Sequence, residues 1–390
     1  MSNKKNLKFP NGFLWGASTS AYQVEGGNFN DWSKWEKSSK RVEQLKKQDK
    51  DPKEYISGIA CDHYNKFKQD FDLAESLNQN AHRFSIEWSR IEPQEGKINQ
   101  GEIEHYRQVL IALKERGLEP FVTLYHWPLP LWLVEKGGWL NPKASYYFDR
   151  YVKIISENLF DEVNFWITIN EPNVYASNSY LKGNWPPQKK NIFNYFKVLK
   201  NLAKAHKLAY KSLHLIDLDC KVGIAKNNIY FEKIPFIGYF WNKYFFNKIE
   251  NYHDFIGLNY YFHAHLFGNK NELVTDMGWE IHPKGIYYVL KKLKIYKKPI
   301  YITENGLADA EDGKREDFIK NHLYWIHQAI QDGVDVKGYL HWSLLDNFEW
   351  DEGFWPRFGL VRVDYKTLKR EICPSAYEYA KICKENKLNL

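Results

Sequence analysis

Residues 144–172, ASYYFDRYVKIISENLFDEVNFWITINEP, join a helical pattern to a short apolar run that ends in a glutamate. The helical pattern covers 144–158, and the run NFWITINEP (164–172) ends at Asn170 and Glu171 before a proline. The same order recurs where a helical pattern at 284–294 precedes PIYITENG (299–306), whose glutamate is Glu304. Strands that alternate with helices are typical of parallel sheets. We therefore expect an α/β fold.

The alternation of helices and strands extends over most of the chain. Further helical stripes cover 62–77, 103–113, 195–215 and 318–330, with apolar residues at three- and four-residue steps. The eight candidate strands are GFLWGASTSAY (12–22), AHRFSIEW (81–88), EPFVTLYHW (119–127), NFWITINEP, KVGIAKNN (221–228), DFIGLNYYF (254–262), PIYITENG and VKGYLHWSLLDN (336–347). This order, without a linker or repeat, predicts one (β/α)8 TIM barrel domain over 1–390. An open doubly wound sheet is the alternative, and we expect the polar stretch 41–55 to be a surface loop.

Composition excludes several classes of protein. Hydrophobic residues make up 44% and charged residues 26% of the 390 residues, as in a folded domain of enzyme size. The net charge of +7 comes from scattered lysines, so nucleic-acid binding is not favoured. Four widely spaced cysteines form no Cys-x-x-Cys pair, and no run is apolar enough for a signal peptide or a membrane span. We expect a cytoplasmic protein with no metal, no cofactor and no membrane partner.

The ends of the candidate strands carry most of the polar and aromatic side chains that suit a binding site. The active site of a TIM barrel lies at the C-terminal ends of its strands. In chain order these positions hold Gln23, Arg83, Glu87, His126, Trp127, Asn170, Glu171, Asn259, Tyr261, Glu304, Asn305, Trp342, Glu349 and Trp350. Any one of them alone is more commonly a helix cap, a surface charge or a core ring. Their convergence at one edge of the barrel is what favours a functional site.

This set of side chains suits a neutral, polyhydroxylated substrate. Amides and carboxylates bind hydroxyl groups, and aromatic rings cover the apolar faces of a sugar. Two carboxylates from different strands can act on a glycosidic bond, one as acid and the other as nucleophile or base. Glu171 and Glu304 lie far apart in the sequence, but strands four and seven of a barrel end at the same cleft.

The chain closely resembles glycoside hydrolase family 1, the retaining β-glucosidases and β-galactosidases. The resemblance runs from Phe9 to Tyr379 and rests on distinctive segments in the order of the family. These segments are FLWGASTSAYQVEG (13–26), RFSIEWSRIEP (83–93), TLYHWPLPLWL (123–133), TINEP (168–172), DFIGLNYY (254–261), TDMGWEIHP (275–283), YITENG (301–306), HWSLLDNFEW (341–350) and RFG (357–359).

The resemblance implies a role for each matching residue. Glu171 would be the acid/base and Glu304 the nucleophile of a double displacement. Arg83, Asn259 and Tyr261 would lie around the nucleophile, where a cation and a phenol keep Glu304 ionised. The remaining substrate-binding residues would be Gln23, His126, Trp127, Asn170, Trp342 as the sugar platform, Glu349, Trp350 and Phe358.

The expected activity is therefore hydrolysis of terminal β-D-glucosyl residues, and of β-galactosyl or β-fucosyl residues, from a small glycoside or oligosaccharide. Three alternatives remain open, namely a transglycosylase, a 6-phospho-β-glucosidase, and a sugar-binding barrel with little turnover. Against the second, Glu349 occupies the place that would face the phosphate, and a carboxylate repels a dianion.

The chain is short for its family between the fifth and sixth strands. KNNIYFEKIPFIGYFWNKYFFNKIENYHDF (226–255) spans that interval, and GNWPPQKK (183–190) stands where a longer loop is common. Because the missing length would build rims beside the cleft, we expect a more open leaving-group side.

Overall fold

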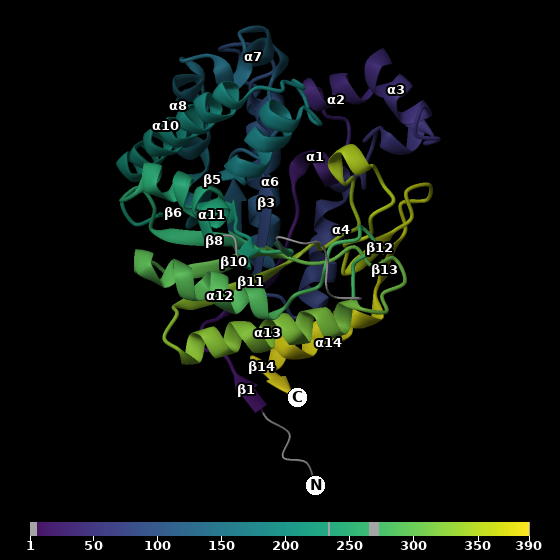
Figure 1. Cartoon of the computed structure of the whole chain (residues 1–390), viewed down its shortest axis with the longest axis vertical. Coiled ribbons are helices and arrows are strands. Elements are labelled where there is room, and N and C mark those ends of the chain that lie inside the picture. Colours follow the sequence, from purple (N-terminus) through teal and green to yellow (C-terminus); the bar gives the residue numbers. More distant parts are fainter. Residues whose placement is uncertain (1–5, 233–234, 265–272, 390) are drawn as a thin grey trace.

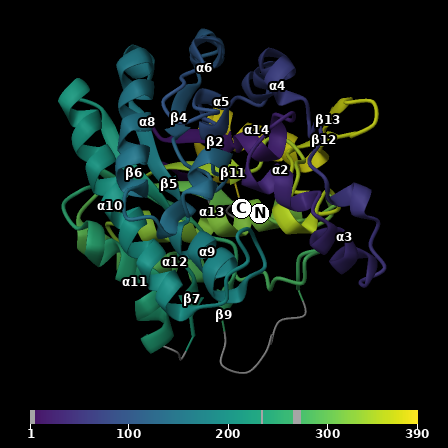
Figure 2. The ribbon, with the colours of Figure 1, turned by 90° about the horizontal axis from the view of Figure 1, so that it is seen from above.

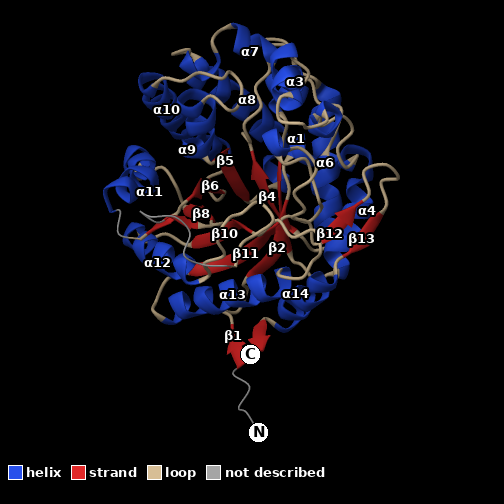
Figure 3. Cartoon of the chain, turned by 45° about the vertical axis from the view of Figure 1, so that its right-hand side comes forward, coloured by secondary structure: helices blue, strands red, loops and turns tan. Residues whose placement is uncertain are grey.

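The fold is known from a computed structural model that describes residues 6–232, 235–264 and 273–389. Within these ranges, parallel strands close into a single eight-stranded barrel that lies inside a ring of helices (Figure 3). Around the barrel the strands run in the order β10 (Ile300–Asn305), β11 (Val336–Trp342), β2 (Leu14–Ser18), β3 (Ala81–Ser85), β4 (Glu119–Thr123), β5 (Phe165–Asn170), β6 (Lys221–Asn227) and β8 (Phe255–Asn259). The TIM barrel prediction is confirmed, and each of the eight predicted strands contains one of these.

Long helices cover the outside of the barrel in chain order (Figure 1). They are α4 (His63–Ser76), α6 (Gln100–Glu115), α8 (Ala144–Leu159), α10 (Ile192–Ile216), α11 (Pro235–Ile249), α12 (Lys284–Leu293), α13 (Arg315–Gln331) and α14 (Pro374–Glu385). Shorter helices follow several strand ends: α1 (Ala21–Val24), α2 (Asp31–Glu36), α3 (Ser39–Lys46), α5 (Trp88–Ile91), α7 (Leu131–Glu135) and α9 (Pro172–Ala176). Among the described residues, none of the helices has the length and apolar character needed to cross a bilayer.

Aromatic rings fill the interior of the barrel near the N-terminal ends of its strands. Phe121 and Phe165 stack with ring centroids 4.3 Å apart, and Phe255 and Tyr301 pack edge-on against Phe121. Burial of a side chain of this size contributes roughly 1.5–3 kcal/mol. Strands β2 and β3 approach so closely at Gly16 that a Cβ atom there would lie 2.0 Å from the Ala81 carbonyl oxygen. The packed interior leaves the opposite end of the barrel for the polar side chains.

The polar stretch 41–55 differs from its prediction as a loop. It contains most of α3 and a 3-10 turn, Pro52–Tyr55. The side chain of Ser38 caps α3 by accepting a hydrogen bond from the Arg41 amide. Arg41 is buried, because its guanidinium lies over the Trp35 ring and donates to the Asp351 carbonyl oxygen. The loop prediction was wrong because this stretch is polar in composition. It nevertheless forms a helix, whose buried residues are Arg41 and Leu45.

In the described part of the chain, three short strand pairs lie outside the barrel. β1 (Asn6–Lys8) pairs with β14 (Lys387–Asn389), so the two ends of the described chain lie together in Figure 1. β12 (Val361–Val363) pairs with β13 (Arg370–Ile372), and β7 (Tyr230–Phe231) pairs with β9 (His263–Ala264). Figure 2 shows α10 and α11 on one side of the barrel and α3 with the β12–β13 pair on the other. Between β6 and β8 the described wall consists of β7 and α11.

Candidate active site

Glu171 and Glu304 both stand at the C-terminal ends of barrel strands. Glu304 is near the end of β10, and Glu171 follows β5 directly and precedes Pro172, the first residue of α9. Glu171 has a φ of 43°, in the left-handed region that residues other than glycine rarely adopt. Trp127 and Trp350 share this region, with φ values of 86° and 52°. Such backbone conformations gather at functional sites, where the surrounding fold imposes them.

Two donors hold the Glu304 carboxyl group. Arg83 Nη1 donates to its Oε1 atom, and the Tyr261 hydroxyl donates to its Oε2 atom at 2.6 Å. Both Arg83 and Glu304 are buried, at 0% and 4% exposure. A paired cation and a phenol hydrogen bond stabilise the anionic form of a buried carboxyl group. The surroundings of Glu304 therefore suit a nucleophile.

The Glu171 carboxyl group has different surroundings. Its Oε1 atom accepts one hydrogen bond from Asn259 Nδ2 at 2.9 Å. Burial and the nearby charge of Glu304 raise the pKa of Glu171 to about 8, and the Asn259 hydrogen bond opposes that rise. At neutral pH Glu171 is therefore protonated. Glu304, by contrast, accepts hydrogen bonds from Arg83 and Tyr261. Two carboxyl groups with such unequal surroundings can divide the roles of acid and nucleophile.

An amide and imidazole network connects the two glutamates. The Asn170 Oδ1 atom accepts from Arg83 Nη2 at 2.7 Å and from Asn259 Nδ2 at 3.2 Å. The Nδ2 atom of Asn170 lies 3.0 Å from His126 Nε2, which must accept. Burial and the Arg83 charge lower the pKa of His126 well below its usual value, so its ring is neutral. Asn259, expected beside Glu304, is its register partner across β8 and β10 but donates to Glu171.

A second polar group comes from α1 and the segment after β11. Gln23 Nε2 donates to Asn347 Oδ1 at 2.8 Å, to the Phe348 carbonyl at 2.9 Å and to Glu349 Oε2 at 3.2 Å. The Gln23 Oε1 atom accepts from Ser20 Oγ at 2.7 Å, which fixes the orientation of the amide. Burial, then Glu304 and Asp351, raise the pKa of Glu349 to about 8. Gln23 and Glu349 thus form one unit that is neutral at pH 7.

Aromatic rings form two groups at this end of the barrel. In the first, Trp350 stacks on His126, and the ring centroids of Trp350 and Trp127 lie 4.5 Å apart. The Nε1 atom of Trp127 donates to the Asn170 carbonyl. In the second, Trp342 and Phe358 pack together, with Tyr261 and Trp279 beside them. The His126 ring also stacks on Trp342 with centroids 6.2 Å apart. The structure thus brings all thirteen predicted site residues to the same end of the barrel.

Two further residues of this region, Asn227 and Trp279, were not predicted from the sequence. Asn227, the last residue of β6, lies near Glu171, where it opposes the rise in the pKa of Glu171, and it accepts from Trp241 Nε1 at 3.2 Å. Its place at the end of the fifth strand was a usable signal that was not followed. Trp279 packs on Tyr261 and Phe358 but lies in the loop before α12, where no strand pattern points to it. Glu87, also noted at a strand end, instead caps α5 and accepts from Ser89 Oγ.

A separate hollow of about 510 Å³ lies between α11 and α12 and involves Asn228, Phe231, Lys243 and Lys292. It contains no carboxylate, so the paired glutamates at the strand ends remain the site of chemistry. Among the described residues, the only His, Cys, Asp and Glu side chains that converge like metal ligands are His263, Glu280 and His282. These lie beside the Tyr261 and Trp279 segments and do not belong to the carboxylate pair.

Proteins of known family and structure resemble this chain over nearly its whole length. The profile of glycosyl hydrolase family 1 matches residues 5–236 and 262–388. β-Glucosidase A of Thermotoga maritima is 40% identical over 448 aligned positions, which cover 98% of this chain and 99% of the relative. The solved β-glycosidase of Pyrococcus horikoshii is 40% identical, with a TM-score of 0.89 and coverage of 98% and 96%. A Thermotoga maritima β-glucosidase solved with deoxynojirimycin is 37% identical, with a TM-score of 0.88 and coverage of 97% and 99%.

Proposed function

The chain belongs to glycosyl hydrolase family 1 and is a hydrolase of the β-glucosidase type, and on this premise we propose the roles of its residues. Glu304 is the nucleophile and Glu171 the acid/base in the hydrolysis of terminal β-D-glucosyl, β-D-galactosyl or β-D-fucosyl residues. One observation carries the assignment. Arg83 and Tyr261 donate to Glu304, whereas burial raises the pKa of Glu171 to about 8.

In the first step Glu304 attacks the anomeric carbon, and the bond to the leaving oxygen breaks. Glu171, which is protonated at pH 7, gives its proton to that oxygen. Tyr261 loses its charged acceptor as Glu304 becomes an ester, so its hydroxyl is free to turn toward the sugar.

In the second step water attacks the glycosyl-enzyme and restores the original anomeric configuration. Formation of the ester removes the negative charge of Glu304, which is one of the causes that raise the pKa of Glu171. The pKa of Glu171 therefore falls in the intermediate, and the same carboxyl group can take a proton from the water.

The sugar is held by groups that the fold already orients. Gln23, His126, Asn170 and Glu349 present amide, imidazole and carboxyl groups to its hydroxyls, and Trp342 gives it an apolar platform. Trp127, Trp350 and Phe358 surround these groups. In support, the Gln23 amide and the His126 ring have fixed hydrogen-bond partners, so little side-chain entropy is lost on binding.

An unphosphorylated sugar suits this site better than a 6-phosphosugar. Glu349 offers no positive charge in either protonation state, and the Arg83 guanidinium already binds Glu304 and Asn170. A phosphate dianion would lack a cationic partner here. Glu349, beside Gln23, can bind two hydroxyl groups of a hexose. We therefore expect it to discriminate only weakly between glucosides and galactosides.

We also propose that residues 1–390 act as one domain on a small β-glycoside or oligosaccharide in the cytoplasm. The four cysteines are free and buried, which fits a reducing compartment.

The test is a panel of nitrophenyl glycosides, namely β-glucoside, β-galactoside, β-fucoside, β-mannoside and 6-phospho-β-glucoside. We expect the first three to be hydrolysed and the last to be at least about tenfold poorer in kcat/KM. Preference for the phosphorylated sugar would contradict the role of Glu349, and no turnover of any glycoside would favour a sugar-binding barrel. The ratio of hydrolysis to transfer, followed with added glucose, separates a hydrolase from a transglycosylase.

A further inference from the structure

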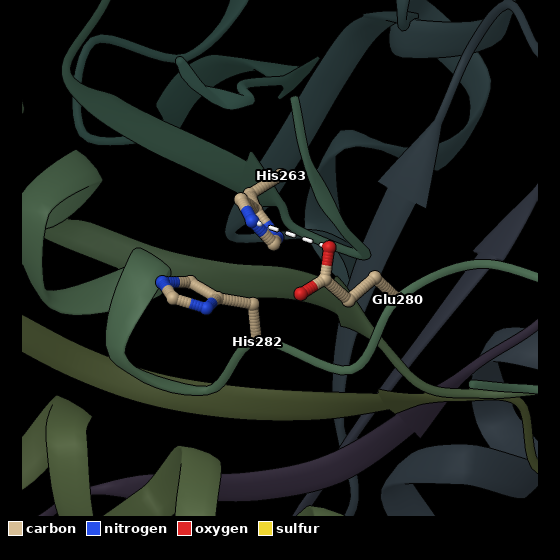
Figure 4. A group of neighbouring side chains, drawn as sticks. All are labelled: His263, Glu280 and His282. Carbon is tan, nitrogen blue, oxygen red and sulfur yellow. Dashed lines mark ion pairs between the residues drawn. The ribbon is translucent and has the colours of Figure 1, made fainter. Parts of the chain in front are cut away.

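His263, Glu280 and His282 form a compact group behind the Tyr261 and Trp279 wall of the site. His263 belongs to β9, while Glu280 and His282 lie in the extended segment before α12. Residues two apart in an extended chain point to the same side, so Glu280 and His282 face His263 together. Figure 4 shows one oxygen of Glu280 directed to His263 and the other on the side of His282.

The spacing of these side chains is that of metal ligands. His263 Nε2 lies 3.4 Å from Glu280 Oε2, and the ligand atoms of all three residues lie within 4.8 Å of one another. Two ligands about 2.1 Å from a tetrahedral zinc ion are themselves about 3.4 Å apart. The first pair therefore already has the required separation, and the ligand atom of His282 lies within 4.8 Å of both.

The surroundings hold the three side chains close together. His263 and Glu280 are buried, with exposures of 6% and 5%, while His282 is partly exposed. The Tyr230 ring stacks on His282 with centroids 5.7 Å apart, and the two imidazole rings lie 4.0 Å apart. Two neutral imidazoles this close can both bind one metal ion.

We propose that His263, Glu280 and His282 bind a divalent transition-metal ion of the zinc class. Two imidazoles and one carboxylate form a ligand set that zinc takes in proteins. Magnesium and calcium bind almost entirely through oxygen, so this site discriminates against them.

The metal ion would stabilise the aromatic side of the active site without touching the substrate. His263 is two residues from Tyr261, which donates to Glu304, and Glu280 follows Trp279, which packs on Tyr261. The Tyr260 hydroxyl also donates to the His282 carbonyl at 2.9 Å. A metal ion bound by all three ligands thus joins β9 to the segment before α12 on the shortened side of the barrel.

The experiment uses the untagged full chain after treatment with a chelator. Titration with Co²⁺ should give the intense visible absorption of a tetrahedral site, saturating at one ion per chain, and Zn²⁺ should displace it. Excess Zn²⁺ should raise Tm by about 3–6 °C, whereas Mg²⁺ and Ca²⁺ should not. His282→Asn, a change at the exposed edge of the group, should weaken binding of both ions by more than about tenfold.

His214→Asn is a matched control, since His214 is also partly exposed, packs edge-on against a tyrosine and pairs with a carboxylate, Asp254, at 2.9 Å. It has no second imidazole, and its loss should leave the cobalt spectrum unchanged. The proposal is overturned if the native protein gives no tetrahedral cobalt spectrum. It is equally overturned if His282→Asn and Glu280→Gln both bind the ion as the native chain does. Circular dichroism and activity on nitrophenyl β-glucoside verify that each variant is folded.

Discussion

At the scale of single residues, the two glutamates differ through their neighbours and not through their positions. Glu171 follows β5 and Glu304 lies near the end of β10, and the motifs around them could be recognised from the sequence. The resemblance also placed Arg83 and Tyr261 beside Glu304, where both donate to its carboxyl group. The partner of Glu171 could not be predicted, because Asn259 was expected beside Glu304 and its contact depends on the register of β8 in the closed barrel. The raised pKa of Glu171 likewise depends on burial, which no local pattern reveals.

Replacement of the proposed nucleophile gives a stereochemical prediction. Glu304→Gly should lower kcat for nitrophenyl β-glucoside by at least about 10⁴-fold. Added azide should restore turnover, because the small anion fits the space left by the side chain and attacks from the same face. The product, identified by NMR, should be the α-glucosyl azide. Formation of the β-azide would assign the nucleophile to another residue.

The pKa of Glu171 predicts the alkaline limit of activity. A group with a pKa of about 8 carries its proton below pH 8 and loses it above, so kcat/KM for an alkyl β-glucoside should fall as pH rises through about 8. Glu171→Gln should lower that activity by roughly 10²–10⁴-fold. It should affect a dinitrophenyl β-glucoside much less, because that leaving group needs no proton. An unchanged alkaline limit in Glu171→Gln would exclude Glu171 as its cause.

At the scale of secondary-structure elements, periodicity predicted the barrel strands and the long outer helices. The stripes at 62–77, 103–113 and 318–330 became α4, α6 and α13 within a few residues at each end. The prediction failed for α3, whose exposed face is polar and whose buried face depends on Arg41. Hydrophobic periodicity cannot detect a helix that packs through the stem and charge of an arginine.

Lys226 connects strand β6 to helix α11. Its side chain is fully buried, and Nζ donates to the Trp241 carbonyl at 2.7 Å and to Asn228 Oδ1 at 3.0 Å. Burial lowers the pKa of Lys226 from 10.5 to about 7. Between pH 7 and 10.5 the unfolded chain therefore binds more protons at this lysine than the folded chain, and its contribution to stability rises with pH.

Lys226→Met should abolish that contribution. We expect the native chain to gain stability relative to the variant as pH rises. Measured by calorimetry, the difference in Tm, native minus variant, should increase by a few degrees between pH 7 and pH 10. Lys221→Met is the control, since Lys221 is exposed at the start of the same strand, and its Tm difference should be constant with pH. A difference for Lys226→Met that stays flat over this range would mean that the lysine is not buried in solution.

At the scale of the whole molecule, the chain departs from its relatives at one side of the barrel. The alignment with the Thermotoga maritima enzyme has 448 positions against 390 residues here, and the family match is interrupted at 237–261. That gap contains most of α11 and all of β8, so Asn259 and Tyr261 stand in it. The barrel nevertheless closes there, because β8 pairs with β6 and β10. Lys226 and Asn227 attach α11 to the end of β6 through Trp241.

Because the wall between β6 and β8 is short, we expect the enzyme to discriminate only weakly between substrates that differ in their leaving group. Among the described residues, the wall between β6 and β8 consists of β7 and α11. We expect kcat/KM for β-1,4-linked glucose oligomers of two to five units to stay within about threefold, which corresponds to less than about 0.7 kcal/mol of added binding. Hydrolysis of nitrophenyl β-glucoside by the same preparation calibrates the active fraction. A tenfold rise with any added unit requires about 1.4 kcal/mol of new contact, and such a rise would demonstrate a formed subsite that the shortened wall should lack.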